Sequence, residues 1–83
     1  MRVTVRYFAA ARAATGVETE HAEIPDGASI DDVLAAVTAR HGEQLARVLP
    51  TCSLLLDEVA VHSRSTRPAE GATIDVLPPF AGG

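Results

Sequence analysis

The last two residues of the chain, Gly82 and Gly83, are the residues whose type and position most clearly suggest chemistry. Neither has a side chain, so the pair can thread into a narrow site and place the α-carboxylate of Gly83 there. A carboxylate is a poor electrophile, but after activation as an acyl-adenylate it can accept a thiol, an amine or sulfide. The reactive group would then be the chain terminus, and the machinery that activates it would belong to partner proteins.

The side chains elsewhere in the sequence offer little for catalysis. His21, His41 and His62 lie far apart, and no two of them have the spacing of metal ligands. The single cysteine, Cys52, is interpreted as a core or strand-edge residue rather than a nucleophile. The absence of lysine excludes a Walker-type phosphate loop and a Schiff-base enzyme. We expect no metal, no bound cofactor and no catalysis by the isolated chain.

The composition is typical of a small globular domain. The chain has 83 residues, of which 47% are hydrophobic and 22% charged. Its formal net charge of -4 argues against nucleic acid and anionic membranes as main partners. No apolar stretch approaches the roughly 18 residues that a membrane span requires, and the N-terminus lacks a signal-peptide pattern. We therefore expect a soluble cytoplasmic protein, with one domain over residues 1–79 and a flexible tail over residues 80–83.

Strands are expected at both ends of the chain. Alternating apolar and polar residues at the N-terminus predict a half-buried strand in which Val3, Val5 and Tyr7 face the core. Asp57 and Glu58 are interpreted as a turn between two further strands. In order, the remaining strand segments are residues 18–24, 53–56, 59–61 and 73–77.

One amphipathic helix is the clearest element of the sequence. Ser29 is a good N-cap, the first turn holds Asp31 and Asp32, where the helix dipole favours anions, and Gly42 can end the helix. Its apolar stripe consists of Ile30, Val33, Leu34 and Val37. Shorter helical segments are expected at residues 9–14 and 44–49. One main helix and four or five strands predict an α+β fold, with the helix on one face of a mixed sheet and the first and last strands in its middle.

Two large apolar residues break the alternation of these strands. Phe8 falls on the same face as Arg6, and Leu77 falls on the same face as Asp75. If the first and last strands run parallel and side by side, Phe8 and Leu77 are neighbours, with Phe80 close by. Exposed patches of this kind mark partner surfaces. The alternative is that the strand ends bend and simply pack these residues.

Both ends of the chain resemble those of one protein family. The start, VTVRYFAAAR over residues 3–12 followed by Gly16, is similar to the start of the sulfur-carrier subunits of molybdopterin synthase, the MoaD/ThiS family. The end, LPPFAGG over residues 77–83, is similar to their end, where a Pro-Pro step leads into a terminal Gly-Gly. The length and the order of elements agree, so the resemblance covers the whole chain.

The resemblance implies a ubiquitin-like β-grasp fold and a chemistry centred on the tail. It implies that an E1-like partner uses ATP to adenylate Gly83, which is then converted to a thiocarboxylate with sulfur from a donor protein. The tail then enters the large subunit of molybdopterin synthase, where the sulfur passes to cyclic pyranopterin monophosphate. Family synthases are heterotetramers of two large and two small subunits. Gly82 would be needed for passage through the channel.

The resemblance also implies which residues contact partners. Phe8, Leu77 and Phe80 match apolar family positions at the interface, and Ala81 is counted with them. Arg12 matches a family arginine that makes a polar contact there. The chain departs from the family where Phe80 replaces a common valine and in the loops around Val61-His62-Ser63 and Gly71-Ala72. These departures concern loops and packing rather than the tail.

Three other functions stay open from the sequence. The chain could carry sulfur for another pathway, such as thiamine thiazole or cysteine formation, because the tail chemistry is the same. It could be a ubiquitin-like modifier that becomes attached to lysines of other proteins. It could also be a plain β-grasp interaction domain in which Gly82 and Gly83 are incidental.

Overall fold

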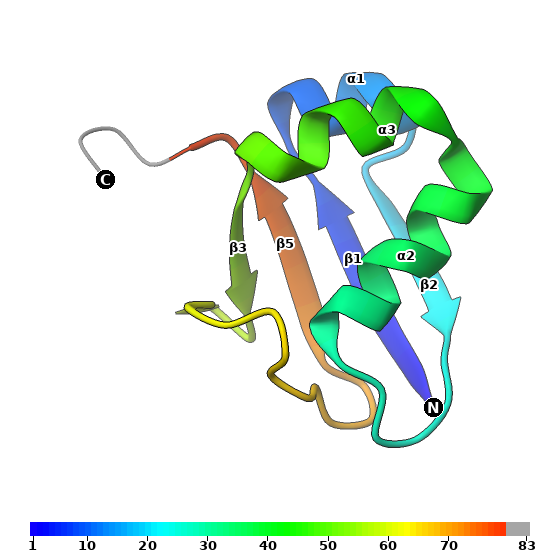
Figure 1. The fold of residues 1–83 in the computed structure, drawn as a ribbon, viewed down its shortest axis with the longest axis vertical. Helices are drawn as coiled ribbons and strands as arrows, with labels where there is room; N and C mark the ends of the chain where they lie inside the picture. Colours follow the sequence, from blue (N-terminus) through cyan, green and yellow to red (C-terminus); the bar gives the residue numbers. More distant parts are fainter. Residues whose placement is uncertain (80–83) are drawn as a thin grey trace.

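The apolar alternation at the N-terminus forms β1 (Arg2–Tyr7), which pairs with neighbours of both orientations. β2 (Thr19–Glu23) runs antiparallel to β1, and β5 (Thr73–Leu77) runs parallel to it. β3 (Ser53–Leu56) lies antiparallel on the other side of β5, and the short β4 (Val59–Ala60) forms the far edge. The computed structural model describes residues 1–79. Its strand order β2-β1-β5-β3-β4 confirms a mixed sheet with the first and last strands inside it (Figure 1).

The main helix, α2 (Ile30–His41), begins at the predicted N-cap. The side chain of Ser29 accepts a hydrogen bond from the backbone N–H of Asp32, whose carboxylate accepts one from the backbone N–H of Ser29. This capping box satisfies two donors that the first turn would otherwise leave unpaired. The helix ends at Gly42, where φ is 81° and a residue with a side chain would be strained.

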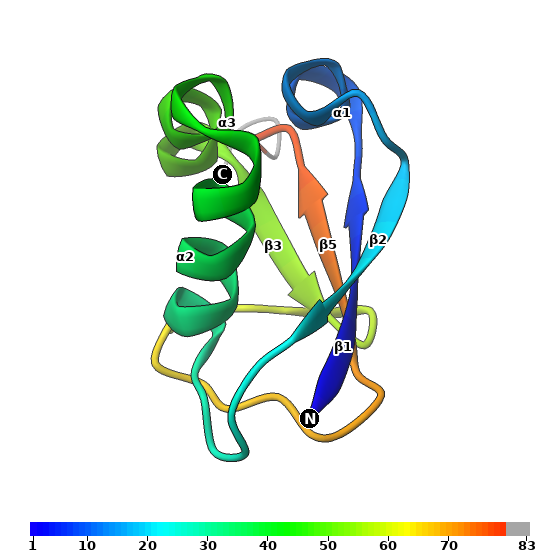
Figure 2. The same ribbon diagram turned by 90° about the vertical axis from the view of Figure 1, so that its right-hand side faces the viewer.

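Residues 1–79 also form three shorter helical segments: α1 (Ala9–Thr15), α3 (Glu43–Val48) and the 3-10 helix η1 (Leu49–Thr51). The segment predicted at 44–49 is therefore α3 followed by η1, since Pro50 has no backbone N–H with which to continue an α-helix. Figure 2 shows α2 and α3 on one side of the sheet and α1 at the end of β1. No helix of residues 1–79 covers the opposite face of the sheet, and we call it the open face.

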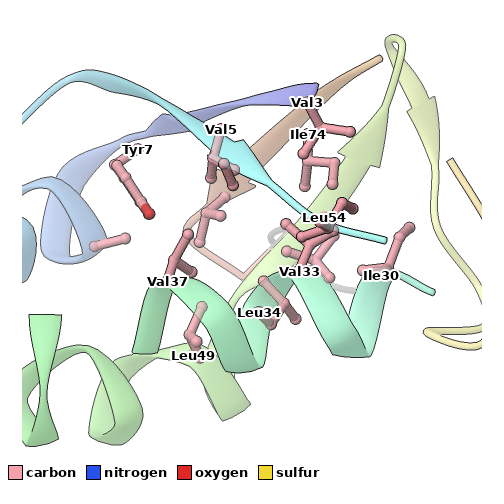
Figure 3. Close-up of a cluster of buried hydrophobic side chains, with 14 of the residues drawn as sticks. Val3, Val5, Tyr7, Ile30, Val33, Leu34, Val37, Leu49, Leu54 and Ile74 are labelled. Carbon is pink, nitrogen blue, oxygen red and sulfur yellow. The ribbon is translucent and has the colours of Figure 1, made fainter. Parts of the chain in front are cut away.

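The core lies between the sheet and α2 (Figure 3). Every residue of the predicted helix stripe is buried, and so are the three predicted core residues of β1. The sheet and the helices add Ile74, Val76, Leu45, Leu49 and Leu54 to this cluster. No helix in residues 1–79 is long and apolar enough to cross a membrane.

The hairpin between β3 and β4 closes through the predicted turn. Asp57 and Glu58 adopt positive φ values of 47° and 70°, a backbone that suits a tight hairpin. The Asp57 carboxylate accepts a hydrogen bond of 2.9 Å from the backbone N–H of Thr73, which holds the hairpin against β5. The predicted third strand residue of β4, Val61, lies outside the strand, although its N–H still donates to the carbonyl of Leu54.

Candidate functional site

Phe8 stands at the junction of β1 and α1 with its side chain partly in solvent. The residue is 39% exposed, which is high for a phenylalanine. Its backbone is held firmly, because its N–H donates to the carbonyl of Val76 at 3.0 Å and its carbonyl accepts from the N–H of Ala11 at 3.1 Å. The exposed ring is therefore presented on a fixed backbone.

The residues at this junction do not favour the start of a helix. Phe8 is the N-cap of α1, and its side chain makes no capping hydrogen bond, whereas Ser, Thr, Asp or Asn would. Ala9 follows with a φ of 49°, a left-handed conformation that favours glycine. Residues that disfavour the local backbone conformation, and that gain no packing in return, are expected mainly at functional positions. Both violations therefore favour a partner-binding role for Phe8.

Leu77 is half-buried at the end of β5, on the same end of the sheet as Phe8. The parallel register pairs Tyr7 with Val76, so the next residue of each strand is Phe8 and Leu77. The condition under which Phe8 and Leu77 were expected to be neighbours, that the first and last strands run parallel and side by side, is thus met. Partner binding by Phe8 and Leu77 stays a prediction.

The tail follows directly from this end of β5. Pro78 and Pro79 leave the strand, and the predictions for the tail concern the residues after them. Phe80, Ala81, Gly82 and Gly83 lie outside the described residues, so their assigned roles stay predictions. The last strand, β5, therefore ends beside Phe8. The segment that is expected to react through its terminal carboxylate begins shortly after this point.

Arg6 and Asp75 form an ion pair on the open face. They are cross-strand neighbours on β1 and β5, with Arg6 Nε 2.5 Å from Asp75 Oδ1 and Nη2 2.7 Å from Oδ2. The Asp75 side chain is only 5% exposed and that of Arg6 is 43% exposed. The guanidinium also lies 5.9 Å from the centre of the Phe8 ring, within the range of a cation–π contact.

Arg12, the predicted polar contact, lies on α1 next to this surface. Its Nη2 is 2.8 Å from Glu18 Oε1 in a pair that is exposed on both sides. A hollow of about 250 Å³ separates β1 from α1 and is lined by Arg6, Phe8, Arg12 and Glu18 among others. The structure therefore places Arg12 and Phe8 on one surface, and it adds Arg6, which the sequence did not single out.

A polar network on the helix side of β1 was not predicted. The Tyr7 hydroxyl donates to Glu20 Oε2 at 2.5 Å, and His41 Nε2 lies 2.5 Å from the same oxygen. Arg40 Nη1 donates to Glu20 Oε1 at 2.5 Å and to the carbonyl of His21 at 3.1 Å. The network joins β1, β2 and the end of α2. Positions 7, 20 and 41 have no sequence signature in common, so only the fold brings them together.

The titration of this network follows from its burial and its hydrogen bonds. Burial, and then the hydrogen bond and the negative charge of Glu20, raise the pKa of the Tyr7 hydroxyl. Burial alone would raise the pKa of Glu20, but the hydrogen bonds from Tyr7, Arg40 and His41 together outweigh it and lower that pKa. The raised tyrosine pKa and the lowered glutamate pKa mean that the fold favours the neutral phenol and the ionised carboxylate. This pair of states suits a structural hydrogen-bond network.

The histidines and Cys52 are the remaining candidates that the sequence raised. Within residues 1–79 no three His, Cys, Asp or Glu side chains come together as metal ligands. Cys52 is half-buried, its Sγ lies 3.3 Å from the carbonyl of Val48, and burial raises the pKa of its thiol. A raised pKa disfavours the thiolate, in line with the interpretation of Cys52 as a core or strand-edge residue rather than a nucleophile.

The five-stranded mixed sheet with one main helix packed on it defines a ubiquitin-like β-grasp protein. The model of the ThiS family matches residues 5–83, and the chain belongs to this family.

The similarity to known proteins extends over the whole chain or nearly all of it. The molybdopterin synthase sulfur carrier subunit of Chlamydomonas reinhardtii is 33% identical over 84 residues, covering 100% of both chains. A Pyrococcus furiosus structure described as subunit 1 of molybdopterin converting factor matches at a TM-score of 0.85 and 26% identity, covering 95% of this chain and 98% of that one. Small archaeal modifier protein 1 of Haloferax volcanii matches at a TM-score of 0.84 and 20% identity, over 95% and 98% of the two chains. At that identity the last match shows the fold alone.

Proposed function

We propose that this chain is the sulfur carrier of molybdenum cofactor biosynthesis, the small subunit of a cytoplasmic molybdopterin synthase. In this proposal the carboxylate of Gly83 is adenylated with ATP by an E1-like enzyme and then converted to a thiocarboxylate with sulfur from a donor protein. The thiocarboxylate enters the large subunit and donates its sulfur to cyclic pyranopterin monophosphate. The carrier and the large subunit assemble as a heterotetramer with two copies of each.

The observation that carries the proposal is the full-length match to a molybdopterin synthase sulfur carrier subunit at 33% identity. The described residues support it in a second way. The exposed Phe8 and the half-buried Leu77 stand at the root of the tail, where a partner that takes up the tail would have to dock. The two locally unfavourable residues at positions 8 and 9 lie at the same place.

The test is a reconstitution with purified components. The chain is incubated with the E1-like enzyme, ATP and a sulfur donor, and is then mixed with the large subunit and cyclic pyranopterin monophosphate. We expect molybdopterin from the full chain and none from a variant that lacks Gly83. The thermal midpoint of that variant should equal that of the full chain, since the deleted residue is not expected to be packed. Product from the variant, or no product from the thiocarboxylated full chain, would contradict the proposal.

The other carrier functions are tested in the same preparation. The thiocarboxylated chain is offered separately to a thiazole-forming system and to a cysteine-forming system. Transfer to either one, without transfer to the pterin precursor, would assign the chain to another sulfur pathway. A lysine-rich acceptor protein in a further arm tests the modifier alternative, for which a covalent adduct is the expected product.

A further inference from the structure

Asp75 is buried on the open face of the sheet. Among residues 1–79 it is the only charged or polar residue that is fully buried. The Arg6 guanidinium covers it and satisfies both of its carboxylate oxygens, at 2.5 and 2.7 Å. A buried carboxylate without such a partner would be strongly unfavourable, so the two residues act as one unit.

A contribution to the stability of the fold does not explain why the chain has an ion pair at positions 6 and 75. Buried ion pairs can often be replaced by well-packed apolar residues at no cost in stability. The cross-strand neighbour of Asp75 on β3 is Leu55, so apolar residues already stand next to the pair. An apolar pair at positions 6 and 75 would also extend the surface that Phe8 and Leu77 begin. The ion pair interrupts that surface, which indicates a role in what the surface binds.

The geometry presents a guanidinium that is held in place and still has free donors. Asp75 uses Nε and Nη2 of Arg6, and no residue among 1–79 accepts a hydrogen bond from the third nitrogen, Nη1. The Phe8 ring lies 5.9 Å from the guanidinium carbon. A guanidinium fixed from two sides loses little conformational freedom when it binds a further acceptor.

The unfilled donor of Arg6, rather than the net charge around it, indicates the chemistry of that acceptor. The hollow between β1 and α1 is lined by two arginines, Arg6 and Arg12, with the exposed Phe8 between them in sequence. Both arginines already have an acidic partner, and Asp57 and Glu58 line a second hollow beside Arg6, so the surface has no excess positive charge. Glu18 also lines the hollow, but it is paired with Arg12, so Arg6 keeps the unfilled donor. Among the side chains of a protein partner, a carboxylate is the group that accepts charge-assisted hydrogen bonds from a guanidinium.

We propose that Arg6, positioned by Asp75, is the specificity-determining contact of this surface and binds a carboxylate side chain of the large subunit that docks over Phe8. The inference rests on the function proposed above, because that function supplies the partner. A large subunit with an apolar side chain at this point would have to desolvate the ion pair without compensation. A large subunit with a carboxylate there would gain a charge-assisted hydrogen bond.

The test replaces the pair with an apolar one, in the variant Arg6→Leu/Asp75→Ala. The large subunit encoded in the same genome is the probe, and its dissociation constant is measured by calorimetry. We expect a midpoint of unfolding that is unchanged or higher and a dissociation constant about tenfold higher, the size of one lost charge-assisted contact. If the pair were only structural, the variant would enlarge the apolar surface and bind as tightly as the unmodified chain or more tightly. That result would overturn the inference.

A second ion pair, between an arginine of β1 and a glutamate of β2, provides the control. Arg2 and Glu23 pair at 2.6 Å, but both side chains are largely exposed and distant in register from Phe8. The variant Arg2→Leu/Glu23→Ala should keep the affinity of the unmodified chain. An equal loss of affinity in both double variants would mean that any removal of charge weakens binding, and it would overturn a specific role for Arg6.

Two further measurements separate this inference from the proposed function. If Phe8→Asp weakens binding and Arg6→Leu/Asp75→Ala does not, the docking surface stands and only the role of Arg6 fails. If neither change affects binding, the proposed docking surface itself is wrong.

On the partner side, acidic residues of the large subunit are changed to amides one at a time. One of these changes should weaken binding to the unmodified chain but not to Arg6→Leu/Asp75→Ala, and the absence of any such coupling would contradict the contact.

Discussion

Arg6 and Tyr7 are consecutive residues of β1 that face opposite sides of the sheet, and each binds a carboxylate of its own chain. On the helix side, the Tyr7 hydroxyl shares Glu20 with Arg40 and His41, so one carboxylate ties two strands to the end of α2. On the open face, Arg6 pairs with Asp75 alone and keeps a nitrogen without an acceptor among residues 1–79. The first cluster is complete within the fold, whereas the second is complete only when a further group binds.

This difference separates residues that hold the fold from residues that the fold presents. Changes in the network of Tyr7, Glu20, Arg40 and His41 should lower stability and leave the affinity of the folded chain for partners unchanged. Changes around Arg6 and Phe8 should lower affinity and leave stability unchanged or higher. The predictions below test this separation.

The largest effect is expected for Glu20→Ala. The substitution removes the acceptor of three side chains and leaves the Tyr7 hydroxyl buried without a partner, which should cost about 2–3 kcal/mol of unfolding free energy. Urea unfolding measures this loss, and binding to the large subunit below the new midpoint should be unchanged. The exposed Glu23→Ala serves as control and should leave the midpoint where it is. A loss of affinity in folded Glu20→Ala would break the separation between the two clusters.

The next effect concerns Phe8→Asp. An exposed aromatic side chain at the centre of a docking surface is a typical hot spot, so the affinity for the large subunit should fall about 100-fold. Aspartate is also a good N-cap, and it should stabilise α1 by about 0.5–1 kcal/mol at a position where Phe8 makes no capping bond. Calorimetry and thermal unfolding of the same sample measure both effects. Unfolding of the domain by this change would mean that Phe8 belongs to the core.

The decrease in the free energy of unfolding at acid pH should depend on Glu20. Because its folded-state pKa lies below the ordinary value of 4.5, this carboxylate stabilises the fold fully above about pH 4.5. The stabilisation is lost as the pH falls through the lowered, folded-state pKa. In Glu20→Gln the free energy of unfolding should therefore decrease less steeply on acidification than in the unmodified chain. Identical slopes in urea titrations at each pH would show that the network does not titrate as described.

The smallest effect is expected for Ala9→Gly. Glycine relieves the left-handed backbone at φ 49°, and its greater freedom in the unfolded chain offsets part of the gain, so stability should rise by about 0.5 kcal/mol. Thermal unfolding measures this as a small increase in the midpoint. The Ala10→Gly variant, within the regular part of α1, should be destabilised instead. A decrease in both variants would mean that Ala9 is not strained.

The sequence predicted the elements better than the contacts between them. The bounds of β3 and β5 and the N-cap at Ser29 follow from local patterns, namely apolar runs and capping chemistry, which act within a few residues. The pairing of Arg6 with Asp75 depends on the register of two strands that are far apart in sequence. Periodicity places both residues on the open face but does not determine which residues lie opposite each other.

The candidate site was predictable to a similar extent. The break in alternation predicted that Phe8 and Leu77 lie together at one end of the sheet, because a strand's period of two is independent of its partners. The network around Glu20 left no such signal, since it depends on where the end of α2 meets β2. The chemistry assigned to Gly83 rests on the terminal Gly-Gly of the sequence and on the family, not on any geometry of the described residues.

The most direct test of the account is the intact mass of the chain after incubation with ATP, the E1-like enzyme and the sulfur donor. The account predicts a gain equal to the difference between one sulfur and one oxygen atom, located by fragmentation to Gly83. The variant without Gly83 provides the matched control, and its mass should stay unchanged. An unchanged mass of the full chain in a system that activates another carrier, or sulfur located at Cys52 instead, would contradict the claim that the chain works through its C-terminal carboxylate.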